Sequence, residues 1–291
     1  MKRALFALLA LQTVLSWRAA VVALPVRVTD GKGHVVSGLT ADNFRILQDG
    51  KPQPVTMFHH GDAPVTLGLV IDASMSMRPK QQALIAAAAS FARSGRPDDE
   101  LFVVTFNDVV TFTLPPGEAF TTDPAVLESA LKVTQPEGRT RLYDAIAESL
   151  KHVKKGKWDR TAIVIVSDGG DNASRRKYSE VRALAEQSQT VIYALGLVDA
   201  GGEEEDPNIL KRLCHDTGGL CYFPPPDASL DDVLSQISHD LREQYVVGFS
   251  PQPNQPEGEH DVRVIATGPK GESLKVRTRP GYIGAGKGGR P

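Results

Sequence analysis

Side chains that offer oxygen atoms gather in three short segments of the sequence. The first reads Asp-Ala-Ser-Met-Ser from position 72, the second Gly-Arg-Thr-Arg from position 138, and the third Ser-Asp-Gly-Gly-Asp from position 167. Oxygen ligands without nitrogen or sulfur select a hard cation such as Mg²⁺, with Mn²⁺ or Ca²⁺ as substitutes. The candidate ligands are Asp72, Ser74, Ser76, Thr140 and Asp168.

The charge of this ligand set indicates what a bound ion could do. Only Asp72 and Asp168 are carboxylates, and a contact of Asp168 through water would leave the direct shell still poorer in negative charge. An octahedral ion has six positions, so a hydroxyl-rich shell leaves it electrophilic, with at least one position held by exchangeable water. A carboxylate of a partner protein is a natural ligand for that position.

The elements that must position these segments read as a parallel sheet. Short, nearly continuous apolar runs at residues 67–71, 101–106, 162–166 and 191–197 are typical of strands buried on both faces. A turn at residues 106–109 leads into a short extra strand, 109–113. Ligands bind beyond the carboxyl ends of the strands in such sheets, and the three segments either follow buried strands or open a helix.

Amphipathic patterns between the strands predict helices. Apolar stripes begin at Leu84, Leu142 and Leu230, with Pro79 placed like a first-turn proline and Ser229 like the start of a capping box. Repeated strand–helix units predict a doubly wound α/β domain over residues 62–243.

The two flanks of this domain are β-rich. In residues 21–61 a hairpin is expected to join 44–47 to 55–58 through Asp49-Gly50, and residues 244–283 contain three strand-like runs. Neither flank has many strands, so we expect them to form one small β-sandwich together, with the α/β domain inserted between them. The Gly-rich tail, 284–291, is expected to be disordered.

The N-terminus is typical of a secretory signal peptide. Lys2 and Arg3 precede a short apolar run, 4–15, and small Ala19 and Ala20 follow. The run is too short for a comfortable membrane span. We therefore expect residues 1–20 to direct export, and the protein to be secreted, periplasmic or on the cell surface.

Export would place the two cysteines in an oxidising setting. Cys214 and Cys221 enclose six residues, and the Gly218-Gly219 pair between them can end a helix and turn the chain into a strand. A disulfide between them is the favoured interpretation. Two buried thiols, or a metal site that includes His215, are the alternatives, although a closed zinc site needs more ligands.

Composition excludes several classes of protein. The chain has 291 residues, a formal net charge of −2 and 41% apolar residues, which are the proportions of an ordinary globular protein. Nucleic-acid binders usually carry a basic excess that is missing here. A membrane contact is expected only through the N-terminal segment.

The three oxygen-rich segments together resemble the metal-ion-dependent adhesion site of von Willebrand factor type A domains. The likeness covers residues 62–243, and the Gly-Leu-Thr-Ala-Asp-Asn-Phe stretch from position 38, Tyr-Val-Val-Gly-Phe-Ser from position 245 and Arg-Pro-Gly-Tyr from position 279 extend it to secreted bacterial relatives. The resemblance implies that the five candidate ligands hold the ion directly or through water, and that the protein is a binding or adhesion module without catalysis.

The same resemblance gives roles to neighbours of the ligands. Gly169 and Gly170 would let the backbone pass close to the ion. Arg139 and Arg141 flank Thr140, where many family members have small residues, and they would either attract an acidic partner or compete with the cation.

Two other classes of function compete with a metal-dependent binding module. A Mg²⁺ phosphohydrolase of the haloacid-dehalogenase type needs a second Asp two residues after the first, and here that position is Ser74. A structural envelope protein would use the metal only to stabilise its fold. Ser74 and Ser76 could also merely cap a helix, and Asp168 could be a turn residue, while Asp144 and Asp171 are expected to support local structure.

Overall fold

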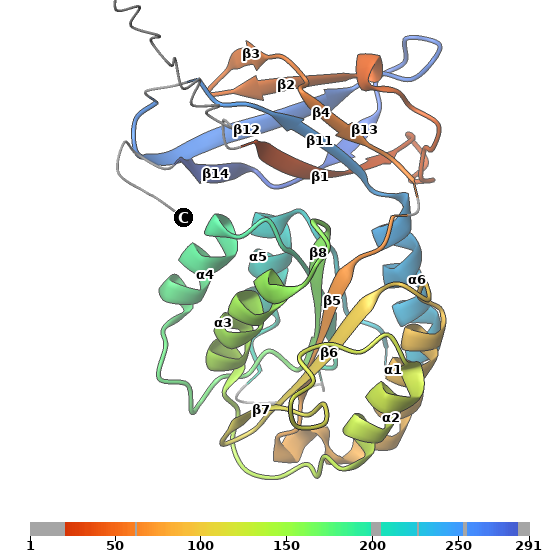
Figure 1. The fold of residues 1–291 in the computed structure, drawn as a ribbon, viewed down its shortest axis with the longest axis vertical. Helices are drawn as coiled ribbons and strands as arrows, with labels where there is room; N and C mark the ends of the chain where they lie inside the picture. The colour runs from red at the N-terminus through yellow and green to blue at the C-terminus, as the bar shows by residue number, and fades with distance from the viewer. Residues whose placement is uncertain (1–20, 62, 199–204, 226, 253–254, 285–291) are drawn as a thin grey trace, which may run out of the picture.

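The computed structural model describes residues 21–61, 63–198, 205–225, 227–252 and 255–284. The expected signal peptide and all but the first residue of the expected tail lie outside these ranges. The described chain forms a β-sandwich stacked on an α/β unit, as Figure 1 shows. Within the described residues, no helix combines the length and the apolar character that a membrane crossing needs.

A six-stranded sheet forms the centre of the α/β unit, in the order β10-β9-β8-β5-β6-β7. Its pairs are parallel except for β7, which runs antiparallel to β6. The expected doubly wound α/β fold is therefore confirmed. The strands are β5 (Thr66–Asp72), β6 (Glu100–Phe106), β7 (Val110–Phe112), β8 (Thr161–Ser167), β9 (Val191–Gly196) and β10 (Cys221–Tyr222).

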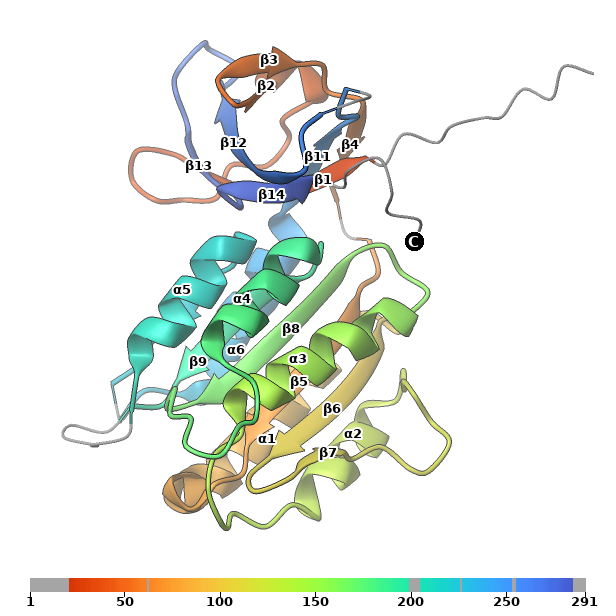
Figure 2. The same cartoon turned by 90° about the vertical axis from the view of Figure 1, so that its left-hand side faces the viewer.

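Helices cover both faces of this sheet (Figure 2). One face carries α1 (Gln81–Arg93), α2 (Pro124–Lys132) and α6 (Leu230–Glu243), and the other carries α3 (Leu142–His152), α4 (Tyr178–Gln187) and α5 (Pro207–Thr217). Strand β5 shows why the runs are apolar throughout: Leu69 packs in the core under α1, whereas the next residue, Val70, packs in the core under α3.

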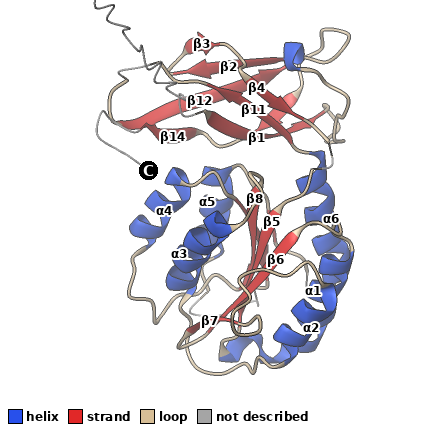
Figure 3. Ribbon diagram, viewed as in Figure 1, coloured by secondary structure: helices blue, strands red, loops and turns tan. Residues whose placement is uncertain are grey.

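The two flanks pair with each other, as expected. Strand β1 (Val22–Thr29) pairs with β11 (Tyr245–Phe249), and β2 (Phe44–Gln48) pairs with β12 (Gly258–Ala266). The resulting sheets have the orders β13-β1-β11-β4 and β14-β12-β2-β3 and enclose an apolar core between them (Figure 3). The remaining strands are β3 (Lys51–Gln53), β4 (Met57–His59), β13 (Lys275–Arg277) and β14 (Gly281–Gly284).

The expected hairpin in the N-terminal flank is wrong in its second strand. The turn at Asp49-Gly50 joins β2 to the short edge strand β3, and both turn residues have positive φ, 49° and 75°. Pro54 follows β3 directly and cannot donate to a ladder, so pairing ends there. Strand β4 instead pairs with β11 in the opposite sheet.

Two further expectations need correction. Pro79 does not open α1, because it lies inside a 3₁₀ helix, Met75–Lys80, that precedes α1. The favoured disulfide is not formed: Cys214 and Cys221 are free thiols, and burial together with a hydrogen bond to Cys221 raises the pKa of Cys214. Gly218 does end α5, in a left-handed conformation with φ of 83°.

Candidate metal centre

The centre of the site is Asp72, the last residue of β5. Its Oδ1 accepts a hydrogen bond from the Ser74 amide at 2.9 Å, and its Oδ2 accepts one from the Ser167 hydroxyl at 2.7 Å. Ser167 ends the neighbouring parallel strand β8. The carboxylate is therefore held between the carboxyl ends of two central strands.

The two serines connect this carboxylate to the second one. The Ser76 hydroxyl donates to Asp168 Oδ2 at 2.8 Å, and the Ser74 and Ser76 hydroxyl oxygens are 3.1 Å apart. Four of the five expected ligands thus lie in one continuous chain of contacts.

Thr140 reaches the same edge on a third loop, which is bonded to both of the others. The Met75 amide donates to the Gly138 carbonyl at 3.3 Å. The Thr140 amide donates to the Asn172 side chain at 2.8 Å, and the Thr140 carbonyl accepts from the Asn172 and Ala173 amides at 3.1 and 3.0 Å. The structure therefore brings all three sequence segments to one edge of the sheet.

Asp144 and Asp171 support the loops around this edge, as expected. Asp171 accepts hydrogen bonds from the Tyr143 amide at 2.8 Å and the Ser174 amide at 3.2 Å. Asp144 accepts from the amides of Arg175 and Arg176 at 3.0 and 3.2 Å. These bonds join the start of α3 to the loop that follows Asp168.

Two glycines in these loops lie so close to neighbouring atoms that a side chain would not fit. Gly169 has φ of 88°, and a Cβ there would lie 2.5 Å from the carbonyl oxygen of Asp206, at the start of α5. Gly138 has φ of 71°, and a Cβ there would meet the Asp108 carboxylate at 2.0 Å. The close approach at Gly169 is thus to the α5 segment. The Gly170 amide donates to Asp168 Oδ1 at 3.0 Å and orients that carboxylate.

The site is buried and carries unbalanced negative charge. Asp72 and Asp168 are only 2% and 6% exposed, and Ser74 and Thr140 are equally buried. Burial raises the pKa of Asp72 to about 6; the charge of Asp168 adds to the rise, and hydrogen bonds from Ser74 and Ser167 oppose it. Among the described residues, the hydrogen-bond partners of both carboxylates are neutral N–H and O–H groups.

A cation fits these observations. Two buried carboxylates that repel each other and have only neutral donors around them leave a net negative charge, which a positive ion would balance. No three side chains of His, Cys, Asp or Glu gather into a metal site in the described parts of the chain, so an ion at this edge would rely on hydroxyl ligands. Such a set suits a hard cation.

A basic and apolar rim surrounds the site. Arg139 forms an exposed ion pair with Asp108, with Nε and Oδ1 2.9 Å apart, and Arg141 directly precedes α3. Met75, between the two serines, is 50% exposed, and Val109, next to Asp108, is 61% exposed.

Three residues of the site were not predicted from the sequence. Ser167 holds Asp72, Asn172 holds Thr140, and Asp108 holds Arg139. Ser167 and Asn172 stand within or beside the third segment, so their polar character was visible but their partners were not. Asp108 lies on a turn whose proximity to Arg139 depends on tertiary structure alone.

Comparison with known proteins agrees with this fold. Residues 67–170 match the model of the von Willebrand factor type A domain. A solved von Willebrand factor type A protein from Catenulispora acidiphila has a TM-score of 0.56 at 12% identity, over 82% of this chain and 72% of that one. The chain contains a von Willebrand factor type A domain, and no curated protein sequence matches it.

Two other solved structures have the same fold. Proximal thread matrix protein 1 from the mussel byssus, with a zinc-occupied metal-ion-dependent adhesion site, has a TM-score of 0.52 at 18% identity, over 68% of this chain and 50% of that one. An aerotolerance-related membrane protein from Bacteroides fragilis has a TM-score of 0.50 at 12% identity, over 61% of this chain and 98% of that one. At identities this low, the structural similarity shows a shared fold alone.

Proposed function

We propose that this protein is an exported binding module that docks an acidic residue of a partner protein on a divalent cation, Mg²⁺ by preference. Asp72, Ser74, Ser76 and Thr140 would hold the ion, with Asp168 in direct or water-mediated contact. A bound ion would supply an electrophilic position for a carboxylate oxygen.

The observation that carries this proposal is the pair of buried carboxylates, Asp72 and Asp168, connected through the Ser74 amide and the Ser74 and Ser76 hydroxyls. Two carboxylates balance the charge of a divalent ion, but together with three hydroxyls they offer five ligands to an ion that prefers six oxygens, which leaves one position for an external carboxylate. Ser74 stands where a phosphohydrolase needs its second carboxylate, and it is bonded within the site. This supports a binding role over catalysis.

The rim indicates what the partner segment would look like. Arg139 and Arg141 favour additional negative charge beside the docking carboxylate, and exposed Met75 and Val109 favour an apolar neighbour. We therefore expect an acidic residue flanked by apolar side chains. The fold similarity to a bacterial membrane protein and the signal-like N-terminus both support a partner in the cell envelope.

Calorimetric titration with Mg²⁺ and Mn²⁺ tests the metal centre. The full chain is expected to bind one ion, and Ser76→Ala is expected to weaken binding at least about tenfold, since it removes a ligand. Ser129→Ala is the matched control, because the Ser129 side chain is exposed on α2 and donates to the Ala125 carbonyl of the same helix. Equal affinity in both variants would contradict the ligand assignment.

Capture from a cell-envelope extract tests the binding role. The protein is expected to retain a partner in Mg²⁺, to release it in EDTA and to recover it when Mn²⁺ is added. Ser129→Ala should behave as the parent does, and Ser76→Ala should capture less. Capture that is indifferent to EDTA would contradict docking on the ion.

A further inference from the structure

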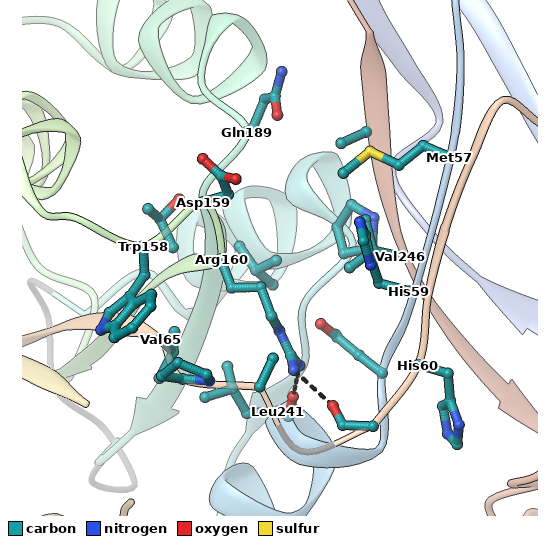
Figure 4. Close-up of a pocket in the computed structure, with 18 of the residues that line it drawn as sticks. Met57, His59, His60, Val65, Trp158, Asp159, Arg160, Gln189, Leu241 and Val246 are labelled. Carbon is teal, nitrogen blue, oxygen red and sulfur yellow. Dashed lines mark hydrogen bonds between the residues drawn. The ribbon is translucent and has the colours of Figure 1, made fainter. Parts of the chain in front are cut away.

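A cavity of about 560 Å³ lies between the β-sandwich and the α/β unit. Figure 4 shows its lining: Met57 and Val246 come from the sandwich, while Trp158, Arg160 and Leu241 come from the α/β unit. Cavities of 300–1,000 Å³ at the junction of two units are the usual sites for small ligands.

This cavity is separate from the metal centre. Strand β5 begins at Thr66, directly after the lining residue Val65, and ends at Asp72. At about 3.3 Å per residue, the strand places the two sites roughly 20 Å apart, at opposite ends of the sheet. A ligand in the cavity would not contact a metal-bound partner.

The cavity walls are largely apolar, and two of their polar side chains have partners inside the protein. Trp158 Nε1 donates to the Asp98 carbonyl at 2.8 Å, and Gln244 Nε2 donates to the Tyr193 hydroxyl at 2.7 Å. A ligand body inside would therefore meet mainly carbon and sulfur. The apolar lining consists of Val21, Ala23, Pro25, Met57, Ala63, Pro64, Val65, Val191, Leu241 and Val246.

The ionisable side chains around the cavity favour a negative head group. Among the described lining residues they are His59, His60, Arg160 and Asp159, so three are basic and one is acidic. Arg160 lies centrally and donates to the carbonyls of Gly61 and Leu241, which fixes its positive charge in the wall (Figure 4). Both imidazoles are exposed.

We propose that this cavity binds an amphipathic monocarboxylic acid, with its apolar body against the walls and its carboxylate on the side of His59 and Arg160. A cavity of roughly 150 Å³ holds one benzene ring, so this volume suits a body several times larger. The proposal is independent of the metal centre and adds a second ligand to the protein.

Trp158 provides a direct readout, since it lines the cavity and the chain has only one other tryptophan, Trp17. Decanoate, below its micellar concentration, is titrated into the full chain carrying Trp17→Phe. We expect a saturable change in Trp158 fluorescence at one site per chain, with a raised melting temperature. A change that grows linearly without saturation overturns the proposal.

Filling the cavity tests the location of the ligand. Ala23→Phe and Ala63→Phe place a ring in the cavity from opposite units, and each is expected to weaken decanoate binding at least about tenfold. Val133→Phe is the matched control, because Val133 is 74% exposed and does not line the cavity. Melting curves show which variants fold. A folded Ala23→Phe or Ala63→Phe variant that binds decanoate like the parent overturns the assignment.

Two comparisons test the chemical class. Decanol and decylamine carry the same chain with a neutral or positive head, and they are expected to bind more weakly than decanoate, in that order. Equal binding of decanol would overturn the carboxylate assignment. EDTA is expected to leave decanoate binding unchanged, so failure here and failure of metal-dependent docking are separate outcomes.

Discussion

At the scale of single residues, Asp72 decides the behaviour of the metal centre. Its carboxylate is buried, shares the site with Asp168 and accepts hydrogen bonds only from neutral Ser groups in the described structure. Without an ion, the charge of Asp72 therefore costs free energy. With an ion, the same charge becomes a ligand.

Asp72→Asn separates the cost of the buried charge in the metal-free protein from its contribution as a metal ligand. The pKa of Asp72 rises from 3.8 to about 6 on folding, so the folded state binds more protons and the metal-free protein loses stability as pH rises between those values. Removing the charge should stabilise the metal-free protein at pH 8 by up to about 3 kcal/mol, and abolish stabilisation by Mg²⁺. Urea unfolding in EDTA and in Mg²⁺ measures both. A variant less stable than its parent in EDTA would contradict this.

Arg139 tests the role of the rim. Its ion pair with Asp108 is exposed, so Arg139→Glu should change the free energy of unfolding by less than about 1 kcal/mol. Partner capture should fall and become less sensitive to salt, because a charge that attracts an acidic segment is reversed. Arg93→Glu, which breaks the exposed pair with Glu128 on the α1–α2 face, is the control. Equal effects of the two variants on partner capture would show that the charge at Arg139 has no specific role in binding.

At the scale of elements, local patterns predicted the site-bearing strands well. The apolar runs ending beside Asp72 and Asp168 correspond to β5 and β8, because strands buried on both faces have no polar positions. Pairing partners were not visible in the same way. A strand was expected over residues 55–58, and the observed strand is 57–59. It pairs across to β11, a contact between segments nearly 190 residues apart that no local pattern encodes.

The candidate site, like the strands, could be predicted from local sequence only in part. The five ligand candidates were identified by type and spacing, whereas Ser167 was recognised only as part of a motif and Asp108 was not recognised at all. Their roles depend on hydrogen bonds between strands or loops that meet only in the folded chain.

The turn between β2 and β3 makes a pH-dependent contribution to stability. The carboxylate of Asp49 accepts a hydrogen bond from His260 Nδ1 at 2.7 Å, which raises the pKa of His260 above 6.5 and lowers the pKa of Asp49 below 3.8. The pair therefore stabilises fully between pH 3.8 and 6.5. This contribution is lost as pH falls through the lowered pKa of Asp49 or rises through the raised pKa of His260.

Asp49→Asn tests this pair. The difference in the free energy of unfolding between parent and variant should be largest near pH 5 and shrink above the raised pKa of His260. Urea denaturation from pH 3 to pH 9 measures it. The control is Asp42→Asn, at an exposed position of the short 3₁₀ helix Ala41–Asn43 that precedes β2. A difference that does not vary with pH would contradict the pairing.

At the scale of the whole molecule, the last helix of the α/β unit is joined firmly to the β-sandwich. Helix α6 runs into β11 through Gln244 alone. Arg27, on β1, forms an ion pair with buried Asp240 on α6, and the Tyr193 hydroxyl donates to the same carboxylate at 2.9 Å. At another contact between the two units, Arg279 donates to the carbonyls of Ala185 and Glu186, at the end of α4.

Arg27→Met should destabilise the protein by about 3 kcal/mol or more, because it leaves Asp240 buried without its cation. Adding Asp240→Leu should restore part of that loss, since the second change removes the uncompensated charge. Chemical denaturation of the two variants and of the single Asp240→Leu change measures the coupling. If the losses of stability in Arg27→Met and Asp240→Leu simply add in the double variant, the pair does not couple the two units.

The central claim is that a bound ion keeps one position open for a partner carboxylate. Water-proton relaxivity of the Mn²⁺-loaded protein tests it most directly, because exchangeable water on Mn²⁺ enhances relaxation. We predict a high relaxivity that falls when a glutamate-containing peptide is added, and that does not fall with the matched glutamine peptide. A relaxivity that is already low, or that the glutamate peptide leaves unchanged, would contradict the account.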